Sequence, residues 1–177
     1  MWSRPLVLAA MLFAAWPAQA DWRPDAWFIE GGAAPKGTWQ VTGGLKWNGS
    51  WKRSWLGTEA TGAVDLQLSH WEWDRFGGGR GSSNVLGLVP LLRLRFDEGR
   101  SPWFVEGGIG LTLADRKYNT PDKQFATAFQ FHDTVAVGRS IGNGSELSVR
   151  IVHTSNAGIK HPNPGENFLQ VRWGSKF

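Results

Sequence analysis

The chain of 177 residues has the size of a single domain and carries a formal net charge of +4. This excess of positive charge is too small to indicate a nucleic-acid partner, although it is compatible with an anionic lipid surface. The sequence has no cysteine, so it offers neither a disulfide framework nor a cysteine for lipid attachment. Beyond residue 20 no apolar run is long enough for a membrane-spanning helix, which excludes a helical membrane protein.

Residues 1 to 20 have the pattern of a cleavable secretory signal peptide. The basic residue Arg4 precedes an apolar run from Pro5 to Trp16, and the segment ends with the small-x-small motif Ala18-Gln19-Ala20. The apolar run is shorter than the roughly 20 residues that a membrane anchor needs. We therefore expect a signal peptide at residues 1–20 and one mature domain at residues 21–177.

The mature sequence alternates between apolar and polar residues over short segments, which is the pattern of β-strands with two different faces. In chain order, the expected strands cover about residues 26–32, 38–47, 60–73, 84–96, 102–113, 124–139, 146–156 and 167–177. Residues 48–59 are the hardest to place, and one interpretation is that they extend the second and third strands beyond the bilayer. Asn143-Gly144 predicts a hairpin turn between the sixth and seventh strands.

The two faces of these strands favour a transmembrane barrel over a soluble sandwich. In the fourth strand Leu86 and Leu88 belong to an apolar row. Arg93 and Arg95 belong to the opposite row, which suits a polar lumen. The last strand alternates in the same way, and the chain ends on the aromatic residue Phe177, a pattern typical of bacterial outer-membrane barrels. The sequence therefore predicts an all-β, eight-stranded antiparallel transmembrane β-barrel in the bacterial cell outer membrane.

Tryptophan is unusually frequent, with 12 residues in the whole chain. Only Trp2 and Trp16 belong to the signal peptide, so most indole rings lie in the mature domain. So many would be unusual in a soluble core of this size, whereas aromatic belts at the two membrane interfaces accommodate them. We therefore expect the tryptophans in such belts.

The seventh strand carries a polar pair, His153 and Ser155, on its apolar face. Leu147, Val149 and Ile151 form a row that leads directly into this pair. With Phe177 at the periplasmic end, the seventh strand runs outward, and the pair lies on the lipid-facing surface at the level of the outer leaflet. Polar groups are costly there. His153 can act as the general base for a nucleophilic Ser155. The alternative is that both are polar residues at the membrane interface with no catalytic role.

Catalysis by this pair also needs a carboxylate that orients the imidazole and a donor for the oxyanion. Glu166 lies just before the eighth strand, so closure of the hairpin brings it beside the top of the seventh; the alternative is a solvated loop acid. Glu106 and Asp133 are further candidates. Asn156 either donates its amide to the oxyanion or makes the turn. We expect no metal site, because the remaining histidines lack metal-like spacing: His70, His132 and His161.

The segment from His153 to Phe168, with residues 104–110 and 129–133, resembles the lipid A 3-O-deacylase family of PagL-type outer-membrane barrels. The motif that carries the resemblance is His153-Thr154-Ser155-Asn156-Ala157-Gly158. The resemblance extends over residues 84 to 177. It implies an eight-stranded barrel that hydrolyses the ester of the 3-hydroxyacyl chain at position 3 of lipid A, without metal or cofactor.

By position in this motif, the resemblance implies Ser155 as nucleophile, His153 as base and Asn156 as oxyanion contributor. The acid of the family pattern falls one residue after Glu166, where this chain has Asn167. A catalytic triad with Glu166, a dyad, and a triad completed by another acid are therefore the open alternatives.

These observations lead to a functional hypothesis. We expect a membrane-embedded serine esterase that acts on lipid A, the anchor of lipopolysaccharide, in the outer leaflet, with no nucleic-acid partner. A homodimer is compatible with this architecture. The alternatives are a non-enzymatic structural or adhesion barrel and an outer-membrane phospholipase.

Overall fold

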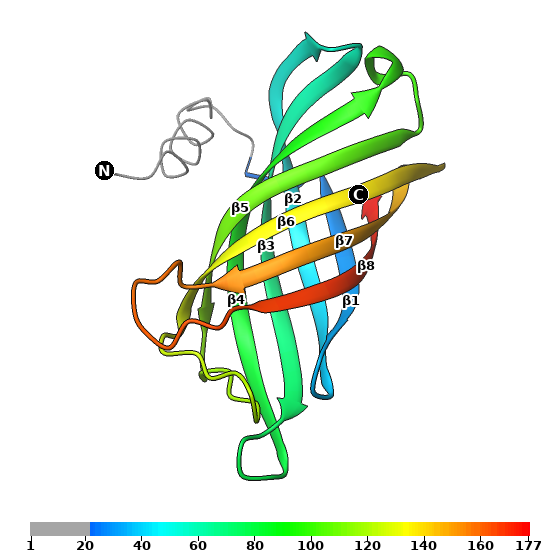
Figure 1. Ribbon diagram of the computed structural model, residues 1–177. Coiled ribbons are helices and arrows are strands. Elements are labelled where there is room, and N and C mark those ends of the chain that lie inside the picture. The colour runs from blue at the N-terminus through cyan, green and yellow to red at the C-terminus, as the bar shows by residue number, and fades with distance from the viewer. Residues whose placement is uncertain (1–21) are drawn as a thin grey trace, which may run out of the picture.

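The computed structural model describes residues 22–177, in which eight strands form one closed antiparallel barrel (Figure 1). This confirms the predicted architecture. The expected signal peptide at residues 1–20 lies outside the described residues. Within the described part, no helix is long and apolar enough to cross a membrane. The elements are β1 (Ala26–Ala34), β2 (Thr38–Trp55), β3 (Thr58–Asp74), β4 (Arg80–Phe96), the short 3₁₀ helix η1 (Asp97–Gly99), β5 (Trp103–Ala114), β6 (Phe129–Gly142), β7 (Ser145–Ser155) and β8 (Glu166–Lys176).

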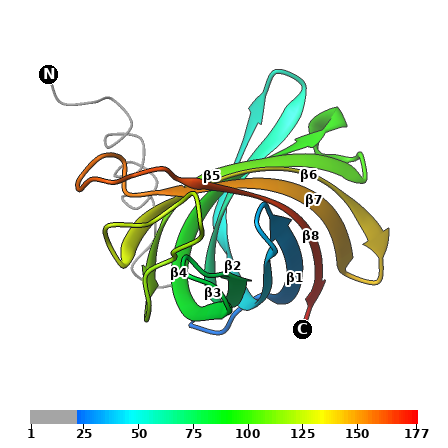
Figure 2. The same ribbon diagram turned by 60° about the horizontal axis from the view of Figure 1, so that its bottom comes forward.

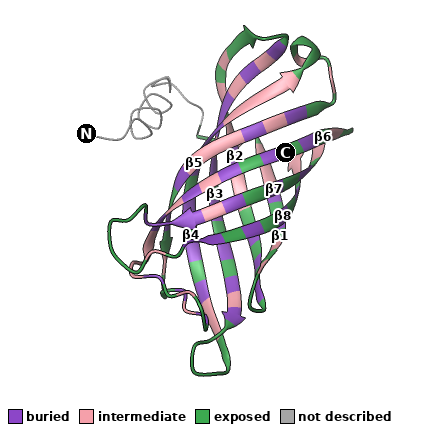
Figure 3. Cartoon of the chain, in the orientation of Figure 1, coloured by how far each residue is buried: buried purple, intermediate pink, exposed green. Residues whose placement is uncertain are grey.

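Closure of the barrel fixes which face of each strand points outward. Each strand pairs with its neighbours in the sequence, and β1 pairs with β8 from Ala26 opposite Lys176 to Ala33 opposite Leu169. Because both edges of every strand are paired, a slip of one residue would turn an apolar face inward. Buried and exposed residues accordingly alternate along the strands (Figure 3). The exposed row of β7 contains Leu147, Val149 and Ile151, as predicted.

The two ends of the barrel carry different connections. The C-terminus and the start of β1 lie at the same end as the turns β2–β3, β4–β5 and β6–β7 (Figure 1). The opposite end, which comes forward in Figure 2, carries the β1–β2 turn and the connections β3–β4, β5–β6 and β7–β8. We call this opposite end the loop end. Strand β7 therefore runs toward the loop end, and β8 starts there.

The structure differs from the expected strand boundaries in two places. Residues 48–59 continue β2 and β3 as a long hairpin that turns at Leu56 and Gly57, whose φ angles are 50° and 73°. The interpretation that this segment extends the two strands is therefore confirmed. β6 begins at Phe129 rather than near residue 124, because residues 115–128 form a loop that packs Tyr118 and Phe125 into the barrel.

An aromatic cluster fills the interior near the loop end. Trp71 and Trp73 of β3 pack there with Tyr118, Phe125 and Phe168, and the ring centroids of Trp71 and Phe168 are 4.6 Å apart. Only 5% of Trp71 and 3% of Trp73 is exposed. The expectation of aromatic belts is therefore wrong for these two residues, because both lie on the inward face of β3 and the β5–β6 loop covers them. Other tryptophans are exposed: Trp22, Trp39, Trp55, Trp103 and Trp173.

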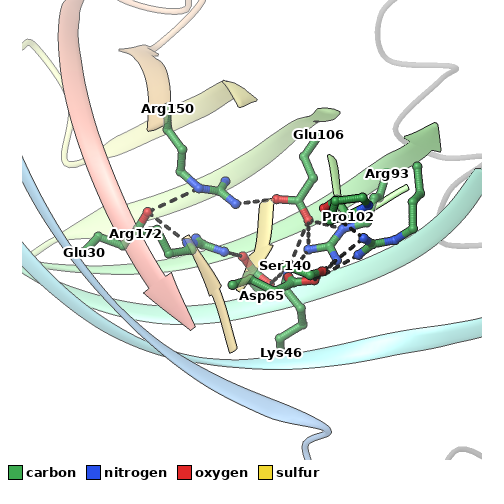
Figure 4. Close-up of polar contacts among 11 residues, drawn as sticks. Glu30, Lys46, Asp65, Arg93, Pro102, Glu106, Ser140, Arg150 and Arg172 are labelled. Atoms are coloured by element: carbon green, nitrogen blue, oxygen red, sulfur yellow. Dashed lines mark hydrogen bonds and ion pairs between the residues drawn. The ribbon is translucent and has the colours of Figure 1, made fainter. Parts of the chain in front are cut away.

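A network of ion pairs crosses the other half of the interior (Figure 4). At its centre, the Glu106 carboxylate accepts hydrogen bonds from Lys46 Nζ at 3.0 Å and Arg93 Nε at 2.8 Å, and it also pairs with Arg150. Buried charges are tolerated here because each faces an opposite charge. The network borders a cavity of about 600 Å³. The members of the ion-pair network are Glu30, Lys46, Asp65, Arg93, Arg95, Glu106, Glu146, Arg150 and Arg172.

Replacing Glu106 by Gln should destabilise the barrel by about 3–5 kcal/mol, because a neutral amide leaves several buried cations without their shared carboxylate. Urea unfolding of the detergent-solubilised barrel, followed by tryptophan fluorescence, measures the effect. The control is Val135→Ile on the outward face, where 67% of the side chain is exposed. It should change the free energy of unfolding by less than about 0.5 kcal/mol. Equal stability of Glu106→Gln and wild type would contradict this account of the network.

Candidate active site on the outer face at the loop end

The predicted pair lies on the outer face of β7, where this strand reaches the loop end. His153 and Ser155 are two residues apart, so they project from the same face. In the neighbouring strands, His153 lies opposite Asp133 of β6 and Asn167 of β8, whereas Ser155 lies opposite Phe131 of β6. His153 is partly exposed, and Ser155 is 9% exposed. The structure therefore places both residues on the outer face of β7 at the loop end, where the sequence predicted them.

Gly165 lies close to both side chains. A Cβ atom at Gly165 would lie 2.6 Å from His153 Cε1, 3.2 Å from His153 Nε2 and 3.5 Å from Ser155 Cβ. Only a glycine therefore leaves room for the imidazole in this position. Gly165 also has a φ of +63°, which glycine adopts without steric cost. Gly165 was not among the predicted site residues, although a glycine directly before a strand signals a special backbone conformation.

Asn167 fixes the orientation of the imidazole. Its Oδ1 lies 2.8 Å from His153 Nδ1. Because an amide oxygen only accepts hydrogen bonds, Nδ1 carries the proton and Nε2 keeps its lone pair. Nε2 and Ser155 Cβ both lie within 3.5 Å of the position that a Cβ atom of Gly165 would occupy, so Nε2 is the ring nitrogen near Ser155. The ring is thus held in the tautomer that a general base for Ser155 requires.

The structure does not bring Glu166, the expected third member of the site, to His153. Glu166 lies opposite Thr154 and points into the interior, where it is 1% exposed. Its Oε1 accepts from Lys123 Nζ at 2.8 Å and from the backbone N–H of Asn167 at 3.0 Å. Consecutive residues of a strand face opposite sides, so Asn167 reaches the outer face and Glu166 reaches the interior.

The Glu166 carboxylate instead ties the β5–β6 loop to the barrel. The Tyr118 hydroxyl donates to Glu166 Oε2 at 2.8 Å and lies 2.7 Å from Thr38 Oγ1 of β2. Burial, together with the negative charge of Glu166, raises the pKa of Tyr118, so the phenol keeps the proton that it donates. The site on β7 and β8 therefore rests on an interior brace that includes two loop residues, Tyr118 and Lys123.

Asn156, the expected oxyanion contributor, is 1% exposed and holds the β7–β8 connection together. Its Nδ2 donates to the Lys160 carbonyl at 2.8 Å and to Thr127 Oγ1 at 3.3 Å. Its Oδ1 accepts from the Gly158 backbone N–H at 2.9 Å. Thr127 belongs to the β5–β6 loop, so Asn156 also links the two loops that lie side by side at the loop end (Figures 1 and 2). Its role at the oxyanion stays a prediction.

The other candidate acids lie on opposite faces of the barrel. Glu106 is part of the interior network, whereas Asp133 lies on the outer face opposite His153. Of the remaining histidines, His132 is buried in the interior, and His70 Nδ1 lies 3.0 Å from Asn84 Oδ1. Among residues 22–177 no group of three or more His, Asp or Glu side chains is arranged to hold a metal ion.

The sequence of the chain is similar to sequences of known proteins. A family model described as lipid A 3-O-deacylase (PagL) matches residues 36–176. The chain is 33% identical over 125 residues to lipid A deacylase PagL of Pseudomonas aeruginosa, covering 69% of each chain. It is 31% identical over 132 residues to lipid A deacylase PagL of Bordetella bronchiseptica, covering 75% of this chain and 68% of that one.

A solved structure has the same fold. The crystal structure of the outer membrane enzyme PagL superimposes with a TM-score of 0.74 at 23% identity, covering 86% of this chain and 99% of the other. At this level of identity the likeness concerns the fold.

Replacing Glu166 by Gln should leave the hydrolytic activity within about threefold of wild type, because the amide is isosteric and Glu166 does not contact the imidazole. Initial rates of acyl release by the detergent-solubilised barrel provide the measurement. A loss of about a hundredfold or more, in a barrel that is still folded, would instead identify Glu166 as the acid of a catalytic triad.

Replacing Gly165 by Ala should lower the turnover number by at least about tenfold, because the new methyl group displaces the imidazole from Ser155. The matched control is Gly57→Ala, in the β2–β3 turn at the other end of the barrel. Gly57 has a φ of +73°, and a methyl group added there would meet no atom within 4 Å, so it shares the backbone strain without the contact. We expect this control to lose stability, by about 1 kcal/mol, but little activity. Equal losses of activity in both variants would show that loop strain, and not displacement of the ring, is responsible.

Proposed function

This chain belongs to the lipid A 3-O-deacylase (PagL) family, and we propose that it removes the 3-O-linked acyl chain from lipid A by serine ester hydrolysis. Membership makes it a hydrolase of ester-linked acyl chains and an outer-membrane barrel. The serine mechanism and the position of the ester on lipid A are our proposal. The observation that carries it is the hydrogen bond between His153 Nδ1 and Asn167 Oδ1, which leaves Nε2 as a base on the side of Ser155.

In the proposed reaction, His153 Nε2 takes the proton from Ser155 Oγ as this oxygen attacks the ester carbonyl. Collapse of the tetrahedral intermediate breaks the bond to the sugar oxygen, which receives the proton from His153 and leaves as the free 3-hydroxyl. A water molecule then loses a proton to the same nitrogen and attacks the carbonyl of the acyl-serine. Collapse of this second tetrahedral intermediate breaks the bond to Ser155 Oγ, which takes back the proton from His153. The products are a 3-hydroxy fatty acid and a lipid A with one acyl chain fewer.

The oxyanion needs donors close to Ser155. We assign this role to Asn156 together with backbone N–H groups of the β7–β8 connection. Asn156 directly follows Ser155, and the longer of its two Nδ2 contacts, 3.3 Å to Thr127, is the one that would yield to a substrate oxygen. Its other contacts keep the loop in place during the reaction.

The position of the site matches a substrate that arrives within the membrane. His153 and Ser155 continue the outward row of Leu147, Val149 and Ile151, whose side chains are 45%, 50% and 63% exposed. In an outer-membrane barrel these side chains face acyl chains of lipid. Lipid A in the outer leaflet therefore reaches Ser155 by lateral diffusion, with its acyl esters near the level of the interface.

Mass spectrometry of lipid A, after incubation with the detergent-solubilised protein and a chelator, tests the proposal. Wild type should remove one 3-hydroxyacyl chain, and Ser155→Ala should lower the rate by more than about 10³-fold. The matched control is Ser145→Ala, which removes a hydroxyl from the same face of β7 at its other end and should keep full activity.

Three outcomes would contradict the proposal in different ways. Activity that is lost with the chelator would indicate a metal-dependent reaction. Release of fatty acid from glycerophospholipid, with lipid A intact, would indicate a phospholipase. Intact lipid A with the folded wild-type barrel and with Ser155→Ala alike would indicate that the site does not catalyse this reaction.

A further inference from the structure

The proposed base, His153, lacks a carboxylate at its Nδ1 atom. Asn167 orients the ring through Oδ1, but its amide is neutral and does not offset a positive charge. When His153 takes the proton from Ser155, the ring becomes an imidazolium at a site that faces lipid. A positive charge in such surroundings is unfavourable unless a negative charge lies nearby.

Asp133 is the carboxylate that the fold places beside this ring. It lies directly opposite His153 in the register of β6 and β7, and both residues belong to the outer face. Side chains that are directly opposite on one face have Cβ atoms about 5 Å apart. Among residues 22–177 the Asp133 carboxylate has no hydrogen bond or ion pair, and His153 is the ionisable side chain directly opposite it.

The surroundings of Asp133 give it no evident structural purpose. The next outward residue of β6 is Val135, which is 67% exposed, and Asp133 itself lies opposite Ile109 of β5. A carboxylate within such an apolar row is costly and would be replaced by an apolar residue if stability alone decided. Its position next to a ring that becomes charged during the reaction supplies the missing reason.

We propose that Asp133 is a positioning residue whose carboxylate stabilises the imidazolium form of His153, in place of a carboxylate at position 167. This inference rests on the proposed function, because it concerns the proton that Ser155 gives up. The proton stays on His153 Nε2 until it passes to the leaving sugar oxygen, and Asp133 remains ionised throughout. The two neighbours of His153 thus have separate roles, because Asn167 sets the tautomer and Asp133 supplies the negative charge.

The test moves the carboxylate from one side of the ring to the other. Four proteins are compared with wild type in lipid A deacylation: Asp133→Asn, Asn167→Asp, the double variant, and Asp97→Asn. Asp97 lies in η1 at the other end of the barrel, so its variant controls for the loss of one negative charge. Heat-modifiable migration in gel electrophoresis verifies that each barrel is folded.

We expect Asp133→Asn to lower kcat by about 10- to 100-fold, because the charge that develops in the transition state loses its partner. KM should stay within about twofold, since the carboxylate does not bind the substrate. Asn167→Asp should be at least as active as wild type. The double variant should recover most of the kcat that Asp133→Asn loses, because the new carboxylate accepts a hydrogen bond from the Nδ1–H group and offsets the charge of the ring. Asp97→Asn should behave as wild type.

An unchanged kcat in Asp133→Asn would overturn the inference. So would a loss that appears mainly in KM, or a loss that Asn167→Asp does not repair, because both would assign Asp133 to substrate binding or to structure. These results differ from a failure of the proposed function. In that case wild type itself would release no acyl chain from lipid A, or would do so as fast as Ser155→Ala, and the inference would fall with it.

Discussion

Every strand of the barrel is hydrogen-bonded along both edges, and the position of each outward side chain follows from this closure. No strand can shift by one residue without moving its whole apolar row from lipid to interior. The register is thereby fixed across eight strands. This is why a site can be built on the outer face from three neighbouring strands, with His153 of β7 between Asp133 of β6 and Asn167 of β8.

The interior supports the outer-face site from behind. Near the loop end, aromatic rings of β3, β8 and the β5–β6 loop pack together, and the Glu166 carboxylate fastens the loop from inside. Toward the other end, paired charges fill the interior. The Glu166 carboxylate also accepts the backbone N–H of Asn167. The start of β8 therefore links the interior to the outer face, because Glu166 points inward and Asn167 points outward.

Glu166 and Asn167 are adjacent in β8, but only Asn167 contacts the imidazole. The two are adjacent, and Glu166 alone has the carboxylate that is usual in a catalytic triad. Because neighbouring residues of a strand face opposite sides, the carboxylate braces the interior and the amide reaches the imidazole. The neutral Asn167 amide orients the imidazole of His153 but does not offset its positive charge. This is why we propose a role for Asp133, the outward carboxylate on the neighbouring strand β6.

The amino-acid sequence was sufficient to predict the architecture, the strand count, and the shared face of His153 and Ser155, because these follow from a two-residue period that is visible locally. It also located the motif of the family. The folded barrel was needed to show that Trp71 and Trp73 are interior, that Gly165 supports the imidazole, and that Asn167 is its partner. Those contacts depend on the pairing of strands and on how the β7–β8 connection folds back, which bring together residues that are distant in the sequence.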